Sequence, residues 1–311
     1  MFPWARIVVP MLTVTLLIPT LCKSASSQAL LADYGSDLQS VGSNGAISNY
    51  LLNVSSSVYG LAFDTNNNLY VAIAMSNGTI IKVTPNKVVS TFASGLNTPI
   101  GVAFDSSGNL FTTQSGSGIL TKITSSGVAT SFATGLNAPQ GIAIDKSDNI
   151  YVANKRTGKI TLITSNGVIS TFASGLIAPS GLVFDSKGNL FVGSFTDSAA
   201  LYKITLGGIV STFATGLFYT QGLAIDLADN IYAADDSDVA HNSTIEKITP
   251  GGVVSTFATN GFPEGGSCLA FSPTLTVPGS VPEPGAIGLL FGSGVTVVGF
   301  AIRRLQRKNR F

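Results

Sequence analysis

Histidine and glutamate, which commonly act as general acids and bases, are scarce in this chain of 311 residues. His241 is the one histidine, and it lies in a long connection from Asp235 to Ser243. Outside the C-terminal segment the glutamates are Glu246 and Glu264. The sequence repeats place no carboxylate beside a histidine at a matching position. The residues therefore predict no catalytic site, and we expect His241 to be a solvated loop residue.

Oxygen-bearing side chains form two groups that could suit calcium. Asp64, Asn66 and Asn68 alternate like the ligands of a calcium loop. A second group is the acidic cluster of Asp235, Asp236 and Asp238. The first pattern recurs along the chain, which favours an Asx-type turn, and the second favours a solvated acidic loop. We therefore expect no metal and no cofactor, with calcium as the alternative.

Polar and aromatic residues also occupy the connections that vary most between repeats. We expect these connections to lie together on one face, around a central funnel. The ligand-binding candidates are Tyr34, Tyr59, Gln114, Gln140, Asn154, Gln221 and Asp235. Aromatic rings and amides around a funnel suit a sugar or a peptide. The alternative is that they are ordinary loop residues.

An internal repeat of about 40 residues positions these side chains. Its first mark is a glycine followed by three apolar residues and an aspartate. This mark begins at Gly60, Gly101, Gly141, Gly181 and Gly222, with spacings of 41, 40, 40 and 41 residues. Strand-sized apolar segments at this period, without helical periodicity between them, predict the blades of a β-propeller.

Each period divides into four expected strands, named a to d. In the first repeat these are strand a at 60–63, strand b at 69–72, strand c at 82–84 and strand d at 90–93. The turn between strands a and b is expected at Asp64 to Asn68. On strand a, a small residue precedes a large one, as in Ala62 and Phe63. This alternation would let neighbouring blades interdigitate near the axis.

The ends of the repeat decide the number of blades. Residues 30–33 align with strand b, and residues 43–48 align with the segment that leads into strand d. Residues 268–271 align with strand a. The N-terminus thus supplies strands b, c and d, the C-terminus supplies strand a, and the shared blade removes exposed sheet edges. The expected fold is an all-β, six-bladed β-propeller over residues 30–272.

Apolar segments at both ends of the chain predict export. Arg6 precedes an apolar stretch, and small residues at 27–29 suit a signal peptidase, so residues 1–29 are expected to be a signal peptide. A linker is expected at 273–284. The 18 apolar residues at 285–302 would span about 27 Å as a helix, enough to cross a membrane. The basic tail at 303–311 is expected to stay cytoplasmic.

Pro282, Glu283 and Pro284 stand directly before that apolar run. The combination resembles the PEP-CTERM sorting signal of Gram-negative bacteria that secrete an extracellular polymer matrix. The resemblance implies recognition by a membrane transpeptidase of the exosortase type and cleavage near the Pro-Glu-Pro. It also implies a brief stay in the inner membrane and release or attachment at the cell surface. The alternative is a permanent single-pass anchor.

The repeat itself resembles a known family. Residues 137–145 followed by 148–154 look like NHL repeats and, more distantly, like the propellers of streptogramin lyase and of the SMP-30/gluconolactonase group. The lyase resemblance implies His and Glu partners, and the lactonase resemblance implies a central metal held by Glu, Asn and Asp. Neither pattern can be placed on residues of this chain. We therefore expect an exported binding or structural module, with a small-molecule lyase or lactone hydrolase in the central funnel as the alternative.

Charge and cysteine content limit the kinds of partner and of covalent cross-link that we expect. The region between leader and tail holds ten Lys and Arg against fifteen Asp and Glu, a net charge near −5. An acidic surface repels phosphate backbones, which argues against nucleic acid. Cys268 is the one cysteine of that region, so an internal disulfide cannot form there. The expected partners are the exosortase-type transpeptidase and a polysaccharide or protein ligand.

Overall fold

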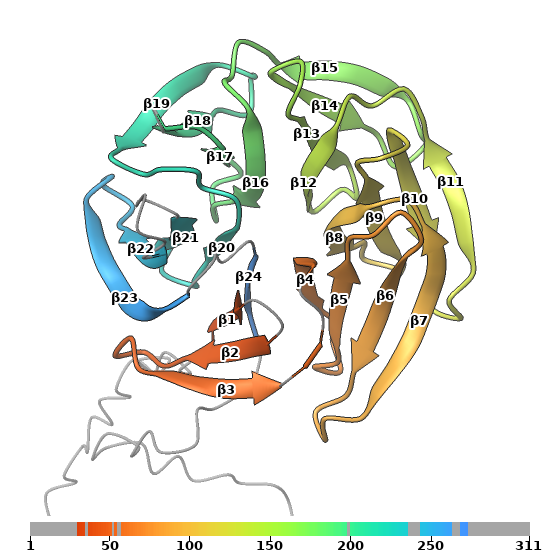
Figure 1. Cartoon of the computed structure of the whole chain (residues 1–311). Coiled ribbons are helices and arrows are strands. Elements are labelled where there is room, and N and C mark those ends of the chain that lie inside the picture. The colour runs from red at the N-terminus through yellow and green to blue at the C-terminus, as the bar shows by residue number, and fades with distance from the viewer. Residues whose placement is uncertain are drawn as a thin grey trace, which may run out of the picture. The chain divides into compact units, whose positions relative to one another are not determined.

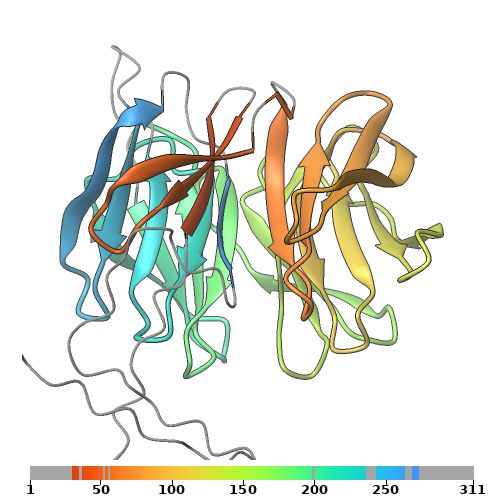
Figure 2. The same cartoon turned by 90° about the horizontal axis from the view of Figure 1, so that it is seen from below.

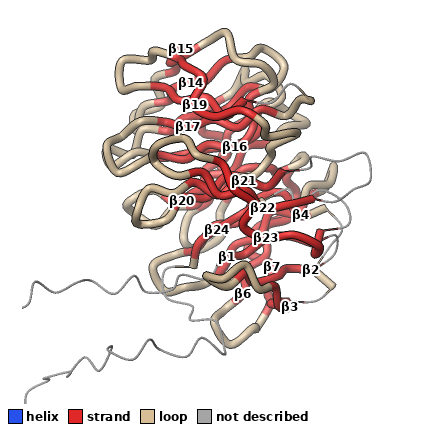
Figure 3. Tube along the Cα trace, turned by 90° about the vertical axis from the view of Figure 1, so that its left-hand side faces the viewer, coloured by secondary structure: helices blue, strands red, loops and turns tan. Residues whose placement is uncertain are grey.

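The computed structural model describes residues 30–34, 37–51, 53–54, 57–197, 200–235, 243–262 and 268–272. They form six four-stranded antiparallel sheets set around a central axis, which confirms the predicted six-bladed propeller (Figure 1). The expected signal peptide, linker, apolar run and basic tail lie outside these residues. Within the described part of the chain, no helix is long and apolar enough to cross a membrane. Figure 3 shows strands and loops alone in that part.

Five blades are continuous in sequence, each running from its innermost to its outermost strand. Blade 1 contains β4 (Val58–Phe63), β5 (Leu69–Ile73), β6 (Gly78–Val83) and β7 (Val89–Leu96). Blade 2 contains β8 (Pro99–Phe104), β9 (Leu110–Gln114), β10 (Ile119–Ile123) and β11 (Ala129–Ala133). Blade 3 contains β12 (Pro139–Ile144), β13 (Ile150–Asn154), β14 (Lys159–Ile163) and β15 (Ile169–Ala173).

The last two continuous blades follow the same order. Blade 4 contains β16 (Pro179–Phe184), β17 (Leu190–Ser194), β18 (Ala200–Ile204) and β19 (Val210–Thr215). Blade 5 contains β20 (Leu223–Ile225), β21 (Ile231–Asp235), β22 (Ser243–Ile248) and β23 (Val254–Phe262).

The sixth blade joins the two ends of the propeller, as the partial repeats predicted. It contains β24 (Leu269–Phe271), β1 (Leu30–Tyr34), β2 (Asp37–Val41) and β3 (Ile47–Leu51). Leu30 pairs with Phe271 across this closing blade in the way that Leu69 pairs with Phe63 in blade 1. The two described chain ends therefore occupy the place of an a-to-b turn.

The propeller has two different faces, at the two ends of its strands (Figure 2). We call the face with the b-to-c and d-to-a connections the loop face, and the face with the a-to-b and c-to-d turns the turn face. On the turn face, the Asp64 carboxylate accepts hydrogen bonds from the Asn66 and Asn68 backbone N–H groups at 2.9 and 2.8 Å. Thr84, expected in strand c, instead starts a c-to-d turn, because its hydroxyl accepts the Val88 N–H at 3.2 Å.

Glycines bring the innermost strands close together at the axis. A Cβ on Gly141 would lie 2.3 Å from the carbonyl oxygen of Ser180 in blade 4, and one on Gly60 would lie 2.1 Å from that of Ile100 in blade 2. Only a residue without a side chain permits this approach of backbone to backbone. Cys268 occupies the sixth place in the ring.

The core between blades alternates with a period of two blades. In blade 1 Tyr70 meets Phe92 of its own blade and Phe104 of blade 2, with ring centroids 4.8 and 4.9 Å apart. Tyr151 in blade 3 and Tyr232 in blade 5 make the same pair of contacts. In blade 2 the smaller Phe111 packs in a cluster with Ile144 of the next blade. Large and medium side chains thus alternate between successive blades and fill the space between them.

Candidate functional site

Three of the predicted binding residues are buried at the ends of their b strands. They are Gln114 of β9, Asn154 of β13 and Asp235 of β21. Each accepts a backbone hydrogen bond from the loop that enters its own blade: from Asn97 N–H at 2.6 Å, Asn137 N–H at 2.8 Å and Phe218 N–H at 2.8 Å, respectively. These side chains therefore fasten the d-to-a loops of blades 2, 3 and 5.

The amide nitrogens of two of these residues are also bound within the protein. Asn154 Nδ2 donates to Thr161 Oγ1 at 2.8 Å, and Gln114 Nε2 donates to Thr121 Oγ1. Neither residue lines the axial pocket. A ligand would have to replace these internal hydrogen bonds to use either amide.

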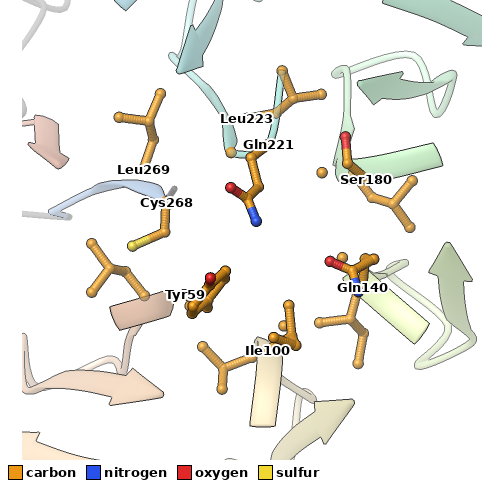
Figure 4. A pocket seen from close by; sticks show the side chains of 17 residues that line it. Tyr59, Ile100, Gln140, Ser180, Gln221, Leu223, Cys268 and Leu269 are labelled. Atoms are coloured by element: carbon orange, nitrogen blue, oxygen red, sulfur yellow. The ribbon is translucent and has the colours of Figure 1, made fainter. Parts of the chain in front are cut away.

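Three other predicted residues come together around the axis. Tyr59, Gln140 and Gln221 each directly precede an axial glycine, and their side chains surround one opening (Figure 4). The opening leads into a cavity of about 80 Å³. Its wall comes from the innermost segments of all six blades, at residues 59–61, 100–102, 140–142, 180–182, 221–223 and 268–269.

Hydrogen bonds around this axial pocket fix its shape. Thr113 donates its hydroxyl to the Gln140 carbonyl oxygen at 2.6 Å and accepts the Gly101 N–H at 2.9 Å, which joins blades 2 and 3. The Ser180 hydroxyl donates to the Thr220 carbonyl oxygen and joins blade 4 to the loop that enters blade 5. These bonds rigidify the wall without using the pocket-facing amides.

The pocket-facing polar groups keep capacity for a ligand. Gln140 Nε2 donates to Ser115 Oγ at 3.2 Å, while its amide oxygen remains available as an acceptor. Among the described residues, the Gln221 side-chain amide and the Tyr59 hydroxyl have no hydrogen-bonding partner. No residue of the described wall carries a charge at neutral pH. The pocket therefore presents neutral donors and acceptors among aliphatic side chains, which suits an uncharged polar group.

A second cluster on the loop face was not recognised as a group from the sequence. The Lys155 ammonium lies 3.8 Å from the centre of the Phe195 ring, and that ring meets Tyr219 edge to face at 5.5 Å. Burial lowers the pKa of Lys155 below its usual value. The three residues lie in connections of blades 3, 4 and 5, and such a distribution gives no local pattern in the sequence.

The remaining candidates are described in part or lie outside the described residues. Tyr34 ends β1, but its side chain is not among the described ones. His241, Asp236 and Asp238 lie outside the described residues. Among those that are described, no three His, Cys, Asp or Glu side chains gather to hold a metal ion.

The described residues therefore form a six-bladed propeller with a small polar pocket at its axis. Residues 280–308 match the PEP-CTERM protein-sorting motif, as their sequence suggested. This motif implies export and a cell-surface destination. A sequence comparison with curated proteins finds no match.

Solved propellers resemble the chain in fold. A streptogramin B lyase structure is 14% identical, with 80% of this chain and 91% of that chain covered at a TM-score of 0.59. Virginiamycin B lyase from Staphylococcus aureus is 19% identical over 65% of this chain and 70% of that chain, at a TM-score of 0.54. A protein proposed to be a gluconolactonase is 17% identical over 68% and 80%, at a TM-score of 0.57. Identities this low establish the fold alone.

Proposed function

We propose that the protein is an exported propeller that binds an uncharged polar group of a sugar or peptide in its axial pocket. The observation that carries this proposal is the convergence of Tyr59, Gln140 and Gln221 on one opening (Figure 4). These residues come from blades 1, 3 and 5, spaced around the ring, so the pocket offers hydrogen bonds from several directions. Such bonds orient a ligand group and give specificity.

The size of the pocket limits what can enter. A cavity of about 80 Å³ is well below the roughly 300 Å³ at which pockets enclose a whole small molecule. Only one terminal group of a larger ligand fits inside, and the rest lies on the loop face. There the aromatic rings of Phe195 and Tyr219 and the Lys155 ammonium are available for contact.

Binding is favoured over lyase or hydrolase chemistry by the composition of the pocket wall. A virginiamycin B lyase variant with one histidine replaced by alanine is catalytically inactive, and its structure contains quinupristin. The described wall of this pocket contains neither a histidine nor a carboxylate. An acid or base for such chemistry would have to come from outside the described residues, where His241 lies.

We further propose that an exosortase-type transpeptidase recognises the C-terminal motif and cleaves near Pro284. The position of Pro-Glu-Pro before an apolar run and a basic tail supports this step. Mass spectrometry of the protein from its native host should show loss of the residues after about Pro284. Recovery of the intact 303–311 segment on the mature protein would instead indicate a permanent anchor.

Binding is tested with a glycan and peptide screen on the purified protein, followed by titration of the hits. Gln140→Ala and Gln221→Ala should each weaken binding about 2- to 12-fold, the equivalent of about 0.5 to 1.5 kcal/mol for one lost hydrogen bond. Asn66→Ala removes an exposed amide on the turn face and should change nothing. If His241→Ala abolished a measurable turnover while both Gln variants bound normally, the enzyme alternative would replace the binding proposal.

A further inference from the structure

Exposed aliphatic side chains form a ring on the turn face, opposite the axial pocket. They are Val88, Val128, Val168, Ile209 and Val253, which are 57% to 69% exposed. Each directly precedes the outermost strand of its blade. The five are therefore equivalent positions of blades 1 to 5, and we call them the aliphatic ring.

The turns hold these side chains outward. In blade 3 the Val168 N–H donates to Thr164 Oγ1 at 3.0 Å, and the same bond recurs between Val88 and Thr84 at 3.2 Å. The hydrogen bonds use only the backbone of the aliphatic residue, so the turn would accept a polar side chain equally well. A repeated exposed aliphatic residue therefore contributes to contacts beyond the blade.

Further apolar side chains extend the ring toward the axis. Leu206 and Leu227 are 74% and 80% exposed, and both line a cleft of about 590 Å³ between blades 3, 4 and 5. Lys146 and Lys187 lie at the same cleft. The turn face thus combines exposed aliphatic side chains with charged side chains of both signs, and exposed aliphatic side chains are the part that can insert at the level of lipid headgroups.

Carboxylates of this face are largely engaged within the protein. Asp185 accepts from its own turn, including Asn189 Nδ2 at 2.7 Å. Asp229 of blade 5 accepts from the backbone and hydroxyl of Ser186 at 2.9 and 2.6 Å. These hydrogen bonds hold the carboxylates in the turns but leave their negative charge, so the face carries aspartates as well as lysines.

The position of the chain ends indicates which partner the turn face contacts. Leu30 and Phe271 pair where the other blades have an a-to-b turn, so the two ends of the described propeller, residues 30 and 272, lie on the turn face. Twelve residues, 273–284, separate the last described residue from the apolar run. Fully extended, they span at most about 40 Å. A propeller tethered by this run stays close to whatever the run enters.

We propose that the turn face docks on the surface of the membrane while the chain is held by residues 285–302. This inference rests on the proposed entry of that run into the membrane. Docking inserts the aliphatic ring at the level of the headgroups. It directs the loop face and the axial pocket away from the bilayer, where a ligand can reach them.

The test uses the full chain with Cys22 replaced by serine, reconstituted in vesicles of zwitterionic phosphatidylcholine. Val168→Cys on the turn face and Ile177→Cys on the loop face each receive an environment-sensitive dye. Ile177 is the matched control because it is also aliphatic and 54% exposed. Unsubstituted protein measures background labelling of the buried Cys268. Spin-labelled lipid should quench the dye at position 168 several-fold more than the dye at position 177.

A second pair of variants tests whether the ring causes the contact. The dye is moved to Leu206→Cys on the same face. Val128→Asp with Ile209→Asp should abolish most of its quenching, since a charged aspartate does not insert as an aliphatic side chain does. Met75→Asp with Ile177→Asp places the same charge on exposed positions of the loop face and should leave the quenching unchanged.

Vesicle flotation separates this inference from the proposed function. Protein that floats while the dye at position 168 remains in water overturns the docking proposal and leaves the membrane anchor intact. If that protein is also a dimer, and Ile209→Asp dissociates it, the turn face instead joins two copies of this chain. Protein that does not float overturns both the anchor and the docking. Quenching at position 168, together with quenching at position 206 that the aspartate pair removes, supports the proposal.

Discussion

Replacement of Gly141 by alanine should loosen the propeller at the interface of blades 3 and 4. The added Cβ would lie 2.3 Å from the Ser180 carbonyl oxygen and 3.0 Å from the Gly181 Cα. Ordinary contacts between carbon and a heavy atom lie near about 3.5 Å, so the two innermost strands would have to separate by about 1 Å. Both obstacles are backbone atoms, which cannot rotate away. Overpacking of this kind costs about 2 to 3 kcal/mol.

Thermal unfolding followed by circular dichroism measures this cost. For a domain of this length, the loss corresponds to a fall in Tm of about 4 to 12 °C. Gly207→Ala is the matched control, because its nearest atom would be Thr205 Oγ1 at 3.9 Å and its φ is not positive. That variant should melt within about 1 °C of the unsubstituted protein. If Gly141→Ala and Gly207→Ala melted alike, close backbone approach would not be the reason for glycine at the axis.

Further predictions concern the turn face, the closing blade and the buried amides. Hydrogen bonds from the Ser106 side chain and backbone lower the pKa of Asp148 below its usual 3.8. These bonds therefore stabilise the folded protein fully above pH 3.8, and this stabilisation is lost as the pH falls through the lowered pKa of Asp148 in the folded state. Ser106→Ala should therefore unfold at lower urea concentration at pH 7, with a difference that shrinks at pH 3, whereas Ser107→Ala should show no such pH dependence. Deletion of residues 30–51 strips the closing blade of three strands, so cooperative unfolding should be lost or the protein should aggregate; an unchanged melting curve would mean that five blades close the ring. Asn154→Ala should lower stability by about 1 to 3 kcal/mol in urea unfolding, since it leaves the Asn137 N–H unpaired.

The number and order of blades could be predicted from the sequence because the repeat is local and periodic. A glycine, an apolar triplet and an aspartate mark each innermost strand, and the partial repeats at the two ends complete one blade. Strand ends were less predictable, since the Thr84 hydroxyl that starts the c-to-d turn also fits a strand pattern. The alternation of tyrosine and phenylalanine between successive blades, as at Tyr70 and Phe111, was not predicted. The clear 40-residue repeat hides a weaker pattern whose period is twice as long.

The candidate site was predictable only in part. Gln140 and Gln221 each stand directly before an axial glycine. Because the repeat fixes that place in the blade, the sequence predicted that both residues lie near the axis, where the structure has them. Position at the end of strand b did not reveal that Gln114 and Asn154 turn inward to bind backbone N–H groups. Their hydrogen-bonding partners lie 17 residues away, and a single sequence does not show which amides are engaged in this way.

The pairing of the first strand with the last imposes an order of events on biogenesis. β1 keeps an open edge until β24 has emerged, because Leu30 pairs with Phe271. An exported chain can therefore complete its ring only after nearly all of the propeller has been translocated, when little more than the tail remains. Cleavage near Pro284 would leave the paired strands intact. Cleavage before Cys268 would remove β24 and return the protein to an open, aggregation-prone sheet.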